Sequence, residues 1–362
     1  MDEQFYSSSV ANSPSQILKL NQSLLRFKAT QPSFPQSFCS EPCGPGQAKL
    51  KLEGDTCCWL CTNCSQYQYL PNEFTCADCP QGTLPDEEGG KRRCVPLTPL
   101  HLSLSNWWTI VSMGIATAGM LATVSTWLVF CRFAETPVIK AAGRELSHLH
   151  LAGILLSFAM TFVIISRPSP LSCSLNRFLL GFCYTVCYSA IVTKTNRIAR
   201  IFRHRSTAKP RFTSPRSQLV ITGLLIAIEV AINVAWILYD PPTTEFVYPA
   251  RDKAVLICSG SERTSYLLGL LYPLVLIGFC TVYAFKTRKC PEGFNEARYI
   301  TFTNYTTCVV WLTFLPMFVL LGTITEVRYL LICSLMSLSG TVQLSCLFVP
   351  KVSAGIVVIK LN

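Results

Sequence analysis

The chain has 362 residues, of which 50% are apolar and only 14% charged, against about 25% charged residues in an average soluble domain. This composition excludes a disordered chain, a collagen and a coiled coil, because each needs a more polar, glycine-rich or heptad-patterned sequence. Apolar runs of twenty or more residues recur along the chain, so two ordinary soluble domains do not fit either. The basic residues behind the formal charge of +11 and the 19 cysteines are unevenly distributed along the chain. Their distribution predicts the domain boundaries and the membrane orientation.

Cysteines divide the chain into zones. Nine of the 19 lie between Cys39 and Cys94, and the other ten are spread from Cys131 to Cys346. Residues 1–38 contain no cysteine and are rich in Ser, Gln, Asn and Pro, a composition typical of a disordered tail. We therefore predict a disordered tail at 1–38, an extracellular cysteine-rich module at 39–96, a seven-transmembrane domain at 102–353 and a short cytoplasmic tail at 354–362.

Seven apolar runs are long enough to cross about 30 Å of hydrocarbon as helices at about 1.5 Å per residue. Spanning strands would be shorter and would alternate in polarity, which these runs do not. The predicted fold class is therefore membrane all-α, a seven-transmembrane helix bundle preceded by a small disulfide-rich extracellular module. The predicted spans are 107–130, 146–166, 174–196, 217–239, 264–285, 299–321 and 329–350.

Charge predicts the orientation of these spans. The loops after the first, third and fifth spans, with the C-terminal end, carry 17 Lys and Arg, whereas the other loops carry 6. Because basic loops stay in the cytoplasm, the N-terminal zone and its nine cysteines are predicted to lie outside. The +11 charge is thus explained by membrane topology, and a nucleic-acid partner is not expected.

The nine clustered cysteines admit two interpretations. Their Cys-x2-Cys spacings would suit zinc, but the module is predicted to be extracellular and has no histidine between Cys39 and Cys94. About 55 residues cannot bury enough core unaided, which favours disulfides and no metal. Nine is odd, so one cysteine is left without a partner inside the module. Cys173 and Cys258 are both predicted to lie outside the membrane, where they could form a further bridge.

Glu229 is the one acidic residue well inside a predicted span. Two interpretations remain open, a protonated acid or a group paired with a polar neighbour such as Asn233, at i+4 on the same helix. A hydrogen bond between helices is the plain structural alternative. The sequence has no catalytic motif, so neither an enzyme nor a cofactor is expected. A transporter would show internal repeats, and none is present.

The loops and the cysteine pattern resemble class C G-protein-coupled receptors, and more narrowly metabotropic glutamate receptors. The module contains Cys57-Cys-Trp-x-Cys61-x2-Cys64. The matching stretches that follow are Glu135-Thr-Pro-Val, Gly143-Arg-Glu-Leu, Thr193-Lys-Thr-Asn-Arg-Ile, Pro210-Arg-Phe, Tyr283-Ala-Phe-Lys-Thr-Arg, Phe294-Asn-Glu-Ala, Tyr305-Thr-Thr-Cys, Val310-Trp-Leu and Phe348-Val-Pro-Lys. Their order and spacing hold across residues 39–353.

The resemblance implies a disulfide pattern that spacing alone leaves open. It pairs Cys39 with Cys58, Cys43 with Cys61, Cys64 with Cys76, Cys79 with Cys94, and Cys173 with Cys258. It leaves Cys57 to join an upstream ligand-binding lobe.

The resemblance also implies roles for residues of the bundle. Lys194 would pair with Glu296 and restrain the resting state. The basic loop from Lys194 to Arg216 would contact the G protein, with Arg197, Arg200, Arg203 and Arg205 in that contact. An allosteric pocket would be formed by Tyr188, Trp311, Phe314 and Ser339.

The function that this resemblance implies is transmission of extracellular motion through the bundle to a heterotrimeric G protein. A homodimer in the lipid of the plasma membrane is expected, with the N-terminus extracellular and sequons at Asn21 and Asn63. Glutamate would bind only through an N-terminal domain that these 362 residues do not contain, so we expect no glutamate response from this chain alone. The alternatives are a calcium-sensing or taste-like class C receptor, or a non-signalling truncated receptor fragment. An incomplete gene model would explain the orphan Cys57.

Overall fold

A computed structural model describes residues 40–51, 58–99, 106–136, 139, 143–203, 214–259, 268–287, 295–321 and 324–353. The predicted tails, 1–38 and 354–362, lie outside the described residues. By its internal contacts the chain divides into two compact units. The first comprises residues 1–79 with 85–95, and the second comprises residues 80–84 with 96–362.

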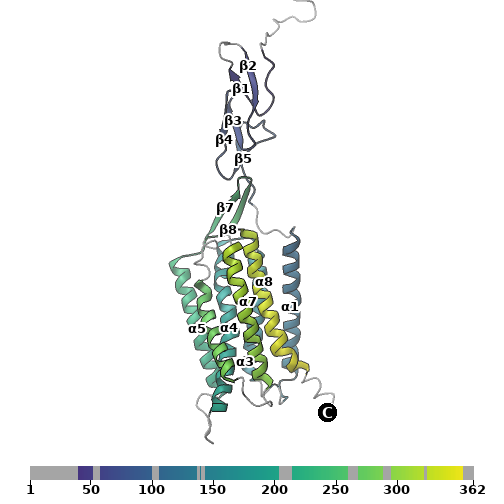
Figure 1. The fold of residues 1–362 in the computed structure, drawn as a ribbon, viewed down its shortest axis with the longest axis vertical. Helices are drawn as coiled ribbons and strands as arrows, with labels where there is room; N and C mark the ends of the chain where they lie inside the picture. Colours follow the sequence, from purple (N-terminus) through teal and green to yellow (C-terminus); the bar gives the residue numbers. More distant parts are fainter. Residues whose placement is uncertain are drawn as a thin grey trace, which may run out of the picture. The chain divides into compact units, whose positions relative to one another are not determined.

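The cysteine-rich region is built from three short strand pairs, of which the first two are antiparallel (Figure 1). Few of its apolar side chains are buried, among them Ala48, Cys64 and Cys79. So small a core cannot stabilise a fold by itself, which is why this region depends on covalent bridges. The paired strands are β1 (Gln47–Lys51) with β2 (Trp59–Asn63), β3 (Gln68–Asn72) with β4 (Thr75–Asp78), and β5 (Thr83–Pro85) with β6 (Cys94–Pro96).

In the described part of the chain, the second unit is a bundle of helices, seven of which are long and apolar enough to span a membrane (Figure 1). The chain is therefore a multi-pass membrane protein, and the predicted fold class is confirmed. The helices are α1 (Trp107–Arg132), α3 (Arg144–Ile165), α4 (Pro170–Arg203), α5 (Pro215–Tyr239), α6 (Leu271–Thr287), α7 (Asn295–Leu321) and α8 (Thr325–Gln343).

Three helix ends differ from the predicted spans. The third helix runs from Pro170 to Arg203 rather than 174–196, because a helix continues past the apolar window wherever its backbone bonds can form. A 3-10 turn at 268–270 leads into α6. After Gln343, α8 continues as a π-helix, Leu344–Phe348. The pattern of apolar residues does not predict this change from i+4 to i+5 hydrogen bonds.

Helix α4 lies at the centre of the bundle, where it packs on α3, α5 and α6. Two thirds of its most apolar window is buried (67%), against 17% in α1 and in α5, which lie at the edge. Between α5 and α6 the chain forms a hairpin of β7 (Thr244–Ala250) and β8 (Lys253–Cys258). The sequence predicted only a loop there.

Candidate functional site

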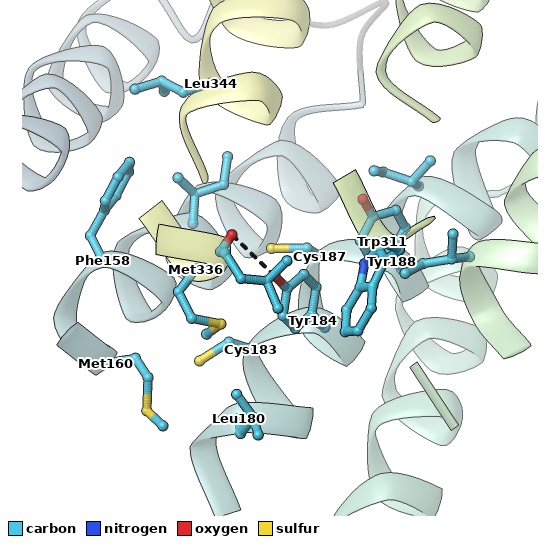
Figure 2. Close-up of a cluster of buried hydrophobic side chains, with 14 of the residues drawn as sticks. Phe158, Met160, Leu180, Cys183, Tyr184, Cys187, Tyr188, Trp311, Met336 and Leu344 are labelled. Carbon is cyan, nitrogen blue, oxygen red and sulfur yellow. Dashed lines mark hydrogen bonds between the residues drawn. The ribbon is translucent and has the colours of Figure 1, made fainter. Parts of the chain in front are cut away.

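Aromatic side chains fill the centre of the bundle between α4 and α7 (Figure 2). The ring of Trp311 meets Tyr184 edge-on at a centroid distance of 5.2 Å and Phe314 at 5.7 Å. Tyr184 stacks on Tyr188 at 6.3 Å. Three residues of the expected pocket, Tyr188, Trp311 and Phe314, thus belong to one aromatic cluster of α4 and α7, in which Tyr184 contacts both Tyr188 and Trp311.

Polar atoms cross this aromatic cluster. The Tyr188 hydroxyl donates to Thr307 Oγ1 at 2.7 Å, which joins α4 to α7. The Tyr184 hydroxyl donates to the Leu335 carbonyl of α8 at 3.3 Å. The Nε1–H of Trp311 is buried and has no hydrogen-bond partner among the described residues. A buried donor without an acceptor is unfavourable, so this atom is a point where a bound molecule would be stabilised.

Ser339, the fourth residue of the expected pocket, is buried on α8 and belongs to a second polar group. It accepts a bond from Gln343 Nε2 at 3.2 Å. Gln343 Oε1 in turn lies 2.8 Å from Nε2 of His150, which joins α8 to α3. The His150 ring also meets Phe348 edge-on at 5.3 Å. Nothing local in the sequence signals a partner for His150 that lies 193 residues away.

Lys194 is buried near one end of α4 (8% exposed). Its Nζ donates to Ser147 Oγ of α3 at 2.9 Å. The expected partner Glu296 begins α7, but its side chain lies outside the described residues.

Of the four arginines expected to contact a G protein, the structure describes two side chains. Arg200 is exposed and its Nε donates to Asn196 Oδ1 at 3.0 Å, one turn earlier on α4. Arg197 is half-buried. The side chain of Arg203 and the whole of Arg205 lie outside the described residues.

The buried face of α5 is polar. Its four buried residues are Gln218, Thr222, Glu229 and Asn233. Asn233 Nδ2 donates to Glu229 Oε1 at 2.7 Å, within the helix and one turn away, so this bond is local and does not join two helices. Thr222 Oγ1 donates to Thr193 Oγ1 of α4 at 2.9 Å. The apolar side of α5 is left for lipid, and the polar stripe faces the bundle.

Four disulfides lie among the described residues, and they are the pairs that the resemblance implies. Cys58 is also disulfide-bonded, whereas Cys39 and Cys57 lie outside the described residues. The four are Cys43–Cys61, Cys64–Cys76, Cys79–Cys94 and Cys173–Cys258.

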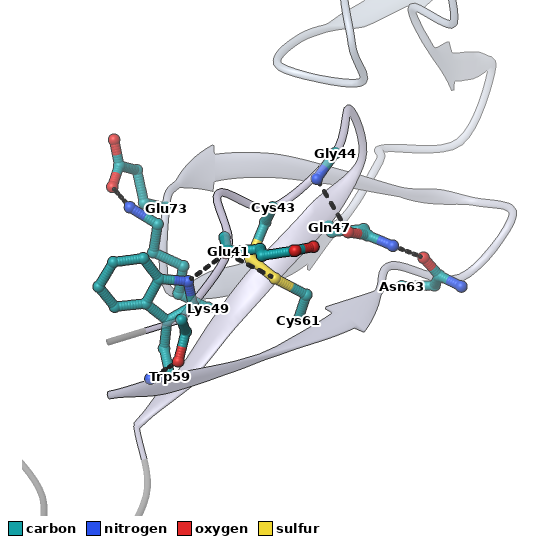
Figure 3. Close-up of a disulfide and its surroundings, with 10 residues drawn as sticks. Glu41, Cys43, Gly44, Gln47, Lys49, Trp59, Cys61, Asn63 and Glu73 are labelled. Carbon is teal, nitrogen blue, oxygen red and sulfur yellow. Dashed lines mark hydrogen bonds and ion pairs between the residues drawn. A yellow bond between two sulfur atoms is a disulfide. The ribbon is translucent and has the colours of Figure 1, made fainter. Parts of the chain in front are cut away.

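Charged side chains support the first strand pair beside the Cys43–Cys61 bridge (Figure 3). Lys49 Nζ lies 2.6 Å from Glu73 Oε2 and 4.7 Å from the ring centroid of Trp59. Trp59 Nε1 donates to the Glu41 carbonyl at 3.2 Å. Lys49 holds the pKa of the Glu73 carboxyl below its usual range. No group of three or more metal-ligating side chains occurs in the described part of the chain.

Comparison with known families settles the class of the bundle. Residues 102–351 match the family described as "7 transmembrane sweet-taste receptor of 3 GCPR". The chain belongs to the class C G-protein-coupled receptors. Residues 34–85 match a second family, the nine-cysteines domain of family 3 receptors. Both families consist of signalling receptors and not of enzymes.

Two relatives identify the group of class C receptors that this chain resembles in sequence. A metabotropic glutamate receptor of Drosophila melanogaster is 43% identical over 320 residues, and a probable metabotropic glutamate receptor of Caenorhabditis elegans, mgl-1, is 40% identical over 320 residues. Each alignment covers 88% of this chain and 32% of the relative, so the chain spans about a third of their length. The predicted resemblance to metabotropic glutamate receptors is confirmed, and the calcium-sensing and taste-like alternatives are not favoured.

Proposed function

We propose that this chain is the membrane-spanning signalling part of a metabotropic-glutamate-type receptor, which passes motion of an extracellular region through the bundle to a heterotrimeric G protein. The observation that carries the proposal is the 43% identity over 88% of the chain. Glutamate, or a related amino acid, would bind a separate N-terminal domain joined through Cys57. Such receptors would lie in the plasma membrane as homodimers.

The proposed parts follow the predicted segments. The cysteine-rich module at 39–96 acts as a stiff lever, because its bridges leave it few ways to deform. The bundle at 102–353 switches between two states, and Lys194 with Glu296 biases the resting one. Arg197, Arg200, Arg203 and Arg205 contact the G protein. The buried Nε1–H of Trp311, which has no hydrogen-bond partner within the described part of the chain, supports an allosteric ligand site formed with Tyr188, Phe314 and Ser339.

Basal signalling tests the proposal. Lys194→Glu places a negative charge where α4 now donates to Ser147 of α3, so the resting contact is lost. Cells expressing the chain with this substitution should show higher basal G-protein activation than wild type at matched surface expression. Unchanged activation in a well-expressed variant would count against the restraint.

The proposed orientation predicts a glycan on Asn63. It opens the sequon Asn63-Cys-Ser65, and both Asn63 and Ser65 are exposed at the end of β2. Asn304 also lies in a sequon but is fully buried in α7. Asn21→Gln removes the other extracellular sequon, so it serves as the parent protein. Enzymatic removal of N-glycans should increase the gel mobility of this parent and of its Ser65→Thr variant, which keeps the Asn63 sequon. Asn63→Gln and Ser65→Ala should abolish that change; a mobility change that survives both would contradict the assignment.

A further inference from the structure

Glu229 is an acidic side chain enclosed by the bundle at the middle of α5, only 1% exposed. Its Oε1 accepts the bond from Asn233, whereas its Oε2 is buried without a hydrogen-bond partner. No ion pair among the described residues involves it. The other acidic residues of the spanning helices, Glu145, Glu296 and Glu326, all lie in first turns. Glu229 is therefore the carboxyl that the fold leaves uncompensated.

Two glycines bring the Glu229 carboxyl close to a second oxygen. A Cβ on Gly181 of α4 would collide with Glu229 Oε1, so α5 approaches α4 here only because residue 181 has no side chain. The same Cβ position lies 2.7 Å from the backbone oxygen of Gly269, in the turn that begins the sixth helical segment. Glu229 Oε1 and the Gly269 carbonyl oxygen thus both lie beside Gly181 of α4.

The Gly269 carbonyl has room for a donor from outside its own helical segment. It lies in the 3-10 turn at 268–270, where the donor spacing is i+3, and the residue at the α-helical spacing i+4 is Pro273, which has no N–H. A carbonyl oxygen can accept two hydrogen bonds, so a donor from Glu229 can be accommodated there.

Among the described residues, the nearby side chains Tyr272 and Arg177 do not supply the missing donor. Tyr272 of α6 donates its hydroxyl to the Leu225 carbonyl at 2.9 Å. Arg177, one turn before Gly181 on α4, is engaged by Asp240, with Nη1 3.0 Å from the carbonyl and 3.3 Å from Oδ2. Two oxygens that both accept repel one another, whereas one proton between them makes a hydrogen bond.

We propose that Glu229 is a proton-binding site, and that its carboxylic acid donates to the Gly269 carbonyl and so holds α5 against α6 across Gly181. Glu229 Oε1 is the carboxyl oxygen that lies beside Gly181 with the Gly269 carbonyl, so the acid donates its proton from Oε1, which still accepts from Asn233 through a lone pair. Loss of the proton leaves two acceptors facing each other and opens this contact. The site is independent of the proposed signalling function, and a bound Na⁺ in place of the proton is the alternative that the test excludes.

Infrared spectroscopy of the purified chain in detergent tests the protonation state. Wild type should show the carbonyl stretch of a protonated carboxylic acid, sensitive to D2O and absent from Glu229→Gln.

Because the amide of glutamine can also donate to Gly269, Glu229→Gln should unfold within about 1 °C of wild type. Glu229→Ala should unfold about 2–4 °C lower, the shift expected for loss of one hydrogen bond in a chain of this size.

A double-mutant cycle tests the partner. Pro273→Ala adds an N–H one α-helical turn after Gly269 that can compete for its carbonyl, so Glu229→Ala should lower the unfolding temperature less in that background. Pro316→Ala, which removes the proline inside α7, is the matched control and should be additive with Glu229→Ala. Additivity with Pro273→Ala, absence of the infrared band, or stabilisation of wild type but not Glu229→Gln by Na⁺ would overturn the proposal.

Discussion

Lys194 of α4 donates a hydrogen bond from Nζ to Ser147 Oγ of α3 at 2.9 Å, and both side chains are buried. The contact joins two helices at the end of the bundle where the basic segment from Lys194 to Arg216 begins. Because Lys194 and Ser147 lie on different helices, a movement of α3 relative to α4 would lengthen or break this hydrogen bond. This pair therefore suits a contact that differs between two states of the bundle.

Ser147→Ala should loosen this contact without adding a charge. We expect the free energy of unfolding to fall by ~1 kcal/mol, the usual contribution of one hydrogen bond, and basal G-protein activation to rise. The measurements are thermal unfolding in detergent and basal activation in cells at equal surface expression. Ser157→Ala is the control, because the Ser157 hydroxyl donates to the Gly153 carbonyl of its own helix at 2.9 Å and its contacts on α4 are the thiols of Cys183 and Cys187, not a charged group. Equal basal activation in both variants would refute a role for Ser147.

His150 and Gln343 should behave as a coupled pair. Replacing either residue by leucine leaves the polar side chain of the other buried without a hydrogen-bond partner. The free energy of unfolding should fall by ~1–3 kcal/mol. The free energy of unfolding of the double variant should fall by less than the sum of the two single changes, because neither member of the pair is left buried without its partner. Unfolding of the four proteins gives the coupling energy, and His150→Leu with Thr222→Val is the distant control pair. A coupling of zero for His150 and Gln343 would contradict the 2.8 Å contact.

Hydropathy predicts the seven helices well because lipid makes length and apolarity necessary for each span. It predicts contacts between helices poorly. The polar face of α5 could be noticed only at Glu229 and Asn233, which are adjacent on one helix. The partners of His150 and Lys194 are set by packing between segments distant in sequence, which no local pattern encodes. Likewise, α4 extends beyond its apolar window because hydrogen bonding, not hydropathy, ends a helix.

Gly153 should tolerate no side chain. A Cβ there would lie 2.7 Å from Cys187 Sγ and 3.2 Å from the Cys187 backbone nitrogen, between α3 and α4. Gly153→Ala should therefore cost ~1–3 kcal/mol of unfolding free energy as an overpacked contact. Gly223→Ala on α5, where a Cβ meets nothing within 4 Å, is the control and should be neutral or stabilising. Equal unfolding temperatures for the two variants would mean that α3 and α4 are not in this close contact.

Asp86 should make the cysteine-rich region sensitive to acid. Its Oδ2 lies 2.8 Å from Arg93 Nε, and its Oδ1 accepts from the Gly89 N–H at 3.1 Å. Arg93, followed by the Gly89 amide, lowers the pKa of the Asp86 carboxyl below its ordinary 3.8. A lowered folded-state pKa gives stability that is present above about pH 4 and is lost as the pH falls through the folded pKa. Thermal unfolding of the intact, disulfide-bonded chain between pH 6 and pH 3 measures this loss, which Asp86→Asn should reduce. An identical acid profile in Asp86→Asn would show that the pair contributes nothing.

The Cys173–Cys258 bridge should be the covalent link on which the bundle depends most. It ties the first turn of α4 to the last residue of β8 across a sequence separation of 85. Loop-closure entropy gives at most ~4–5 kcal/mol for a loop of that length, and inserted helices already restrict the unfolded chain, so the measured effect should be smaller. Cys173→Ser with Cys258→Ser should still lower the unfolding temperature by several degrees, since about 1 kcal/mol shifts it by about 2–4 °C in chains of this size. Cys131→Ser, which changes an exposed free cysteine, is the matched control and should leave the temperature unchanged. If the double serine variant unfolds at the wild-type temperature while non-reducing electrophoresis verifies that the bridge is gone, then packing alone positions the hairpin of β7 and β8.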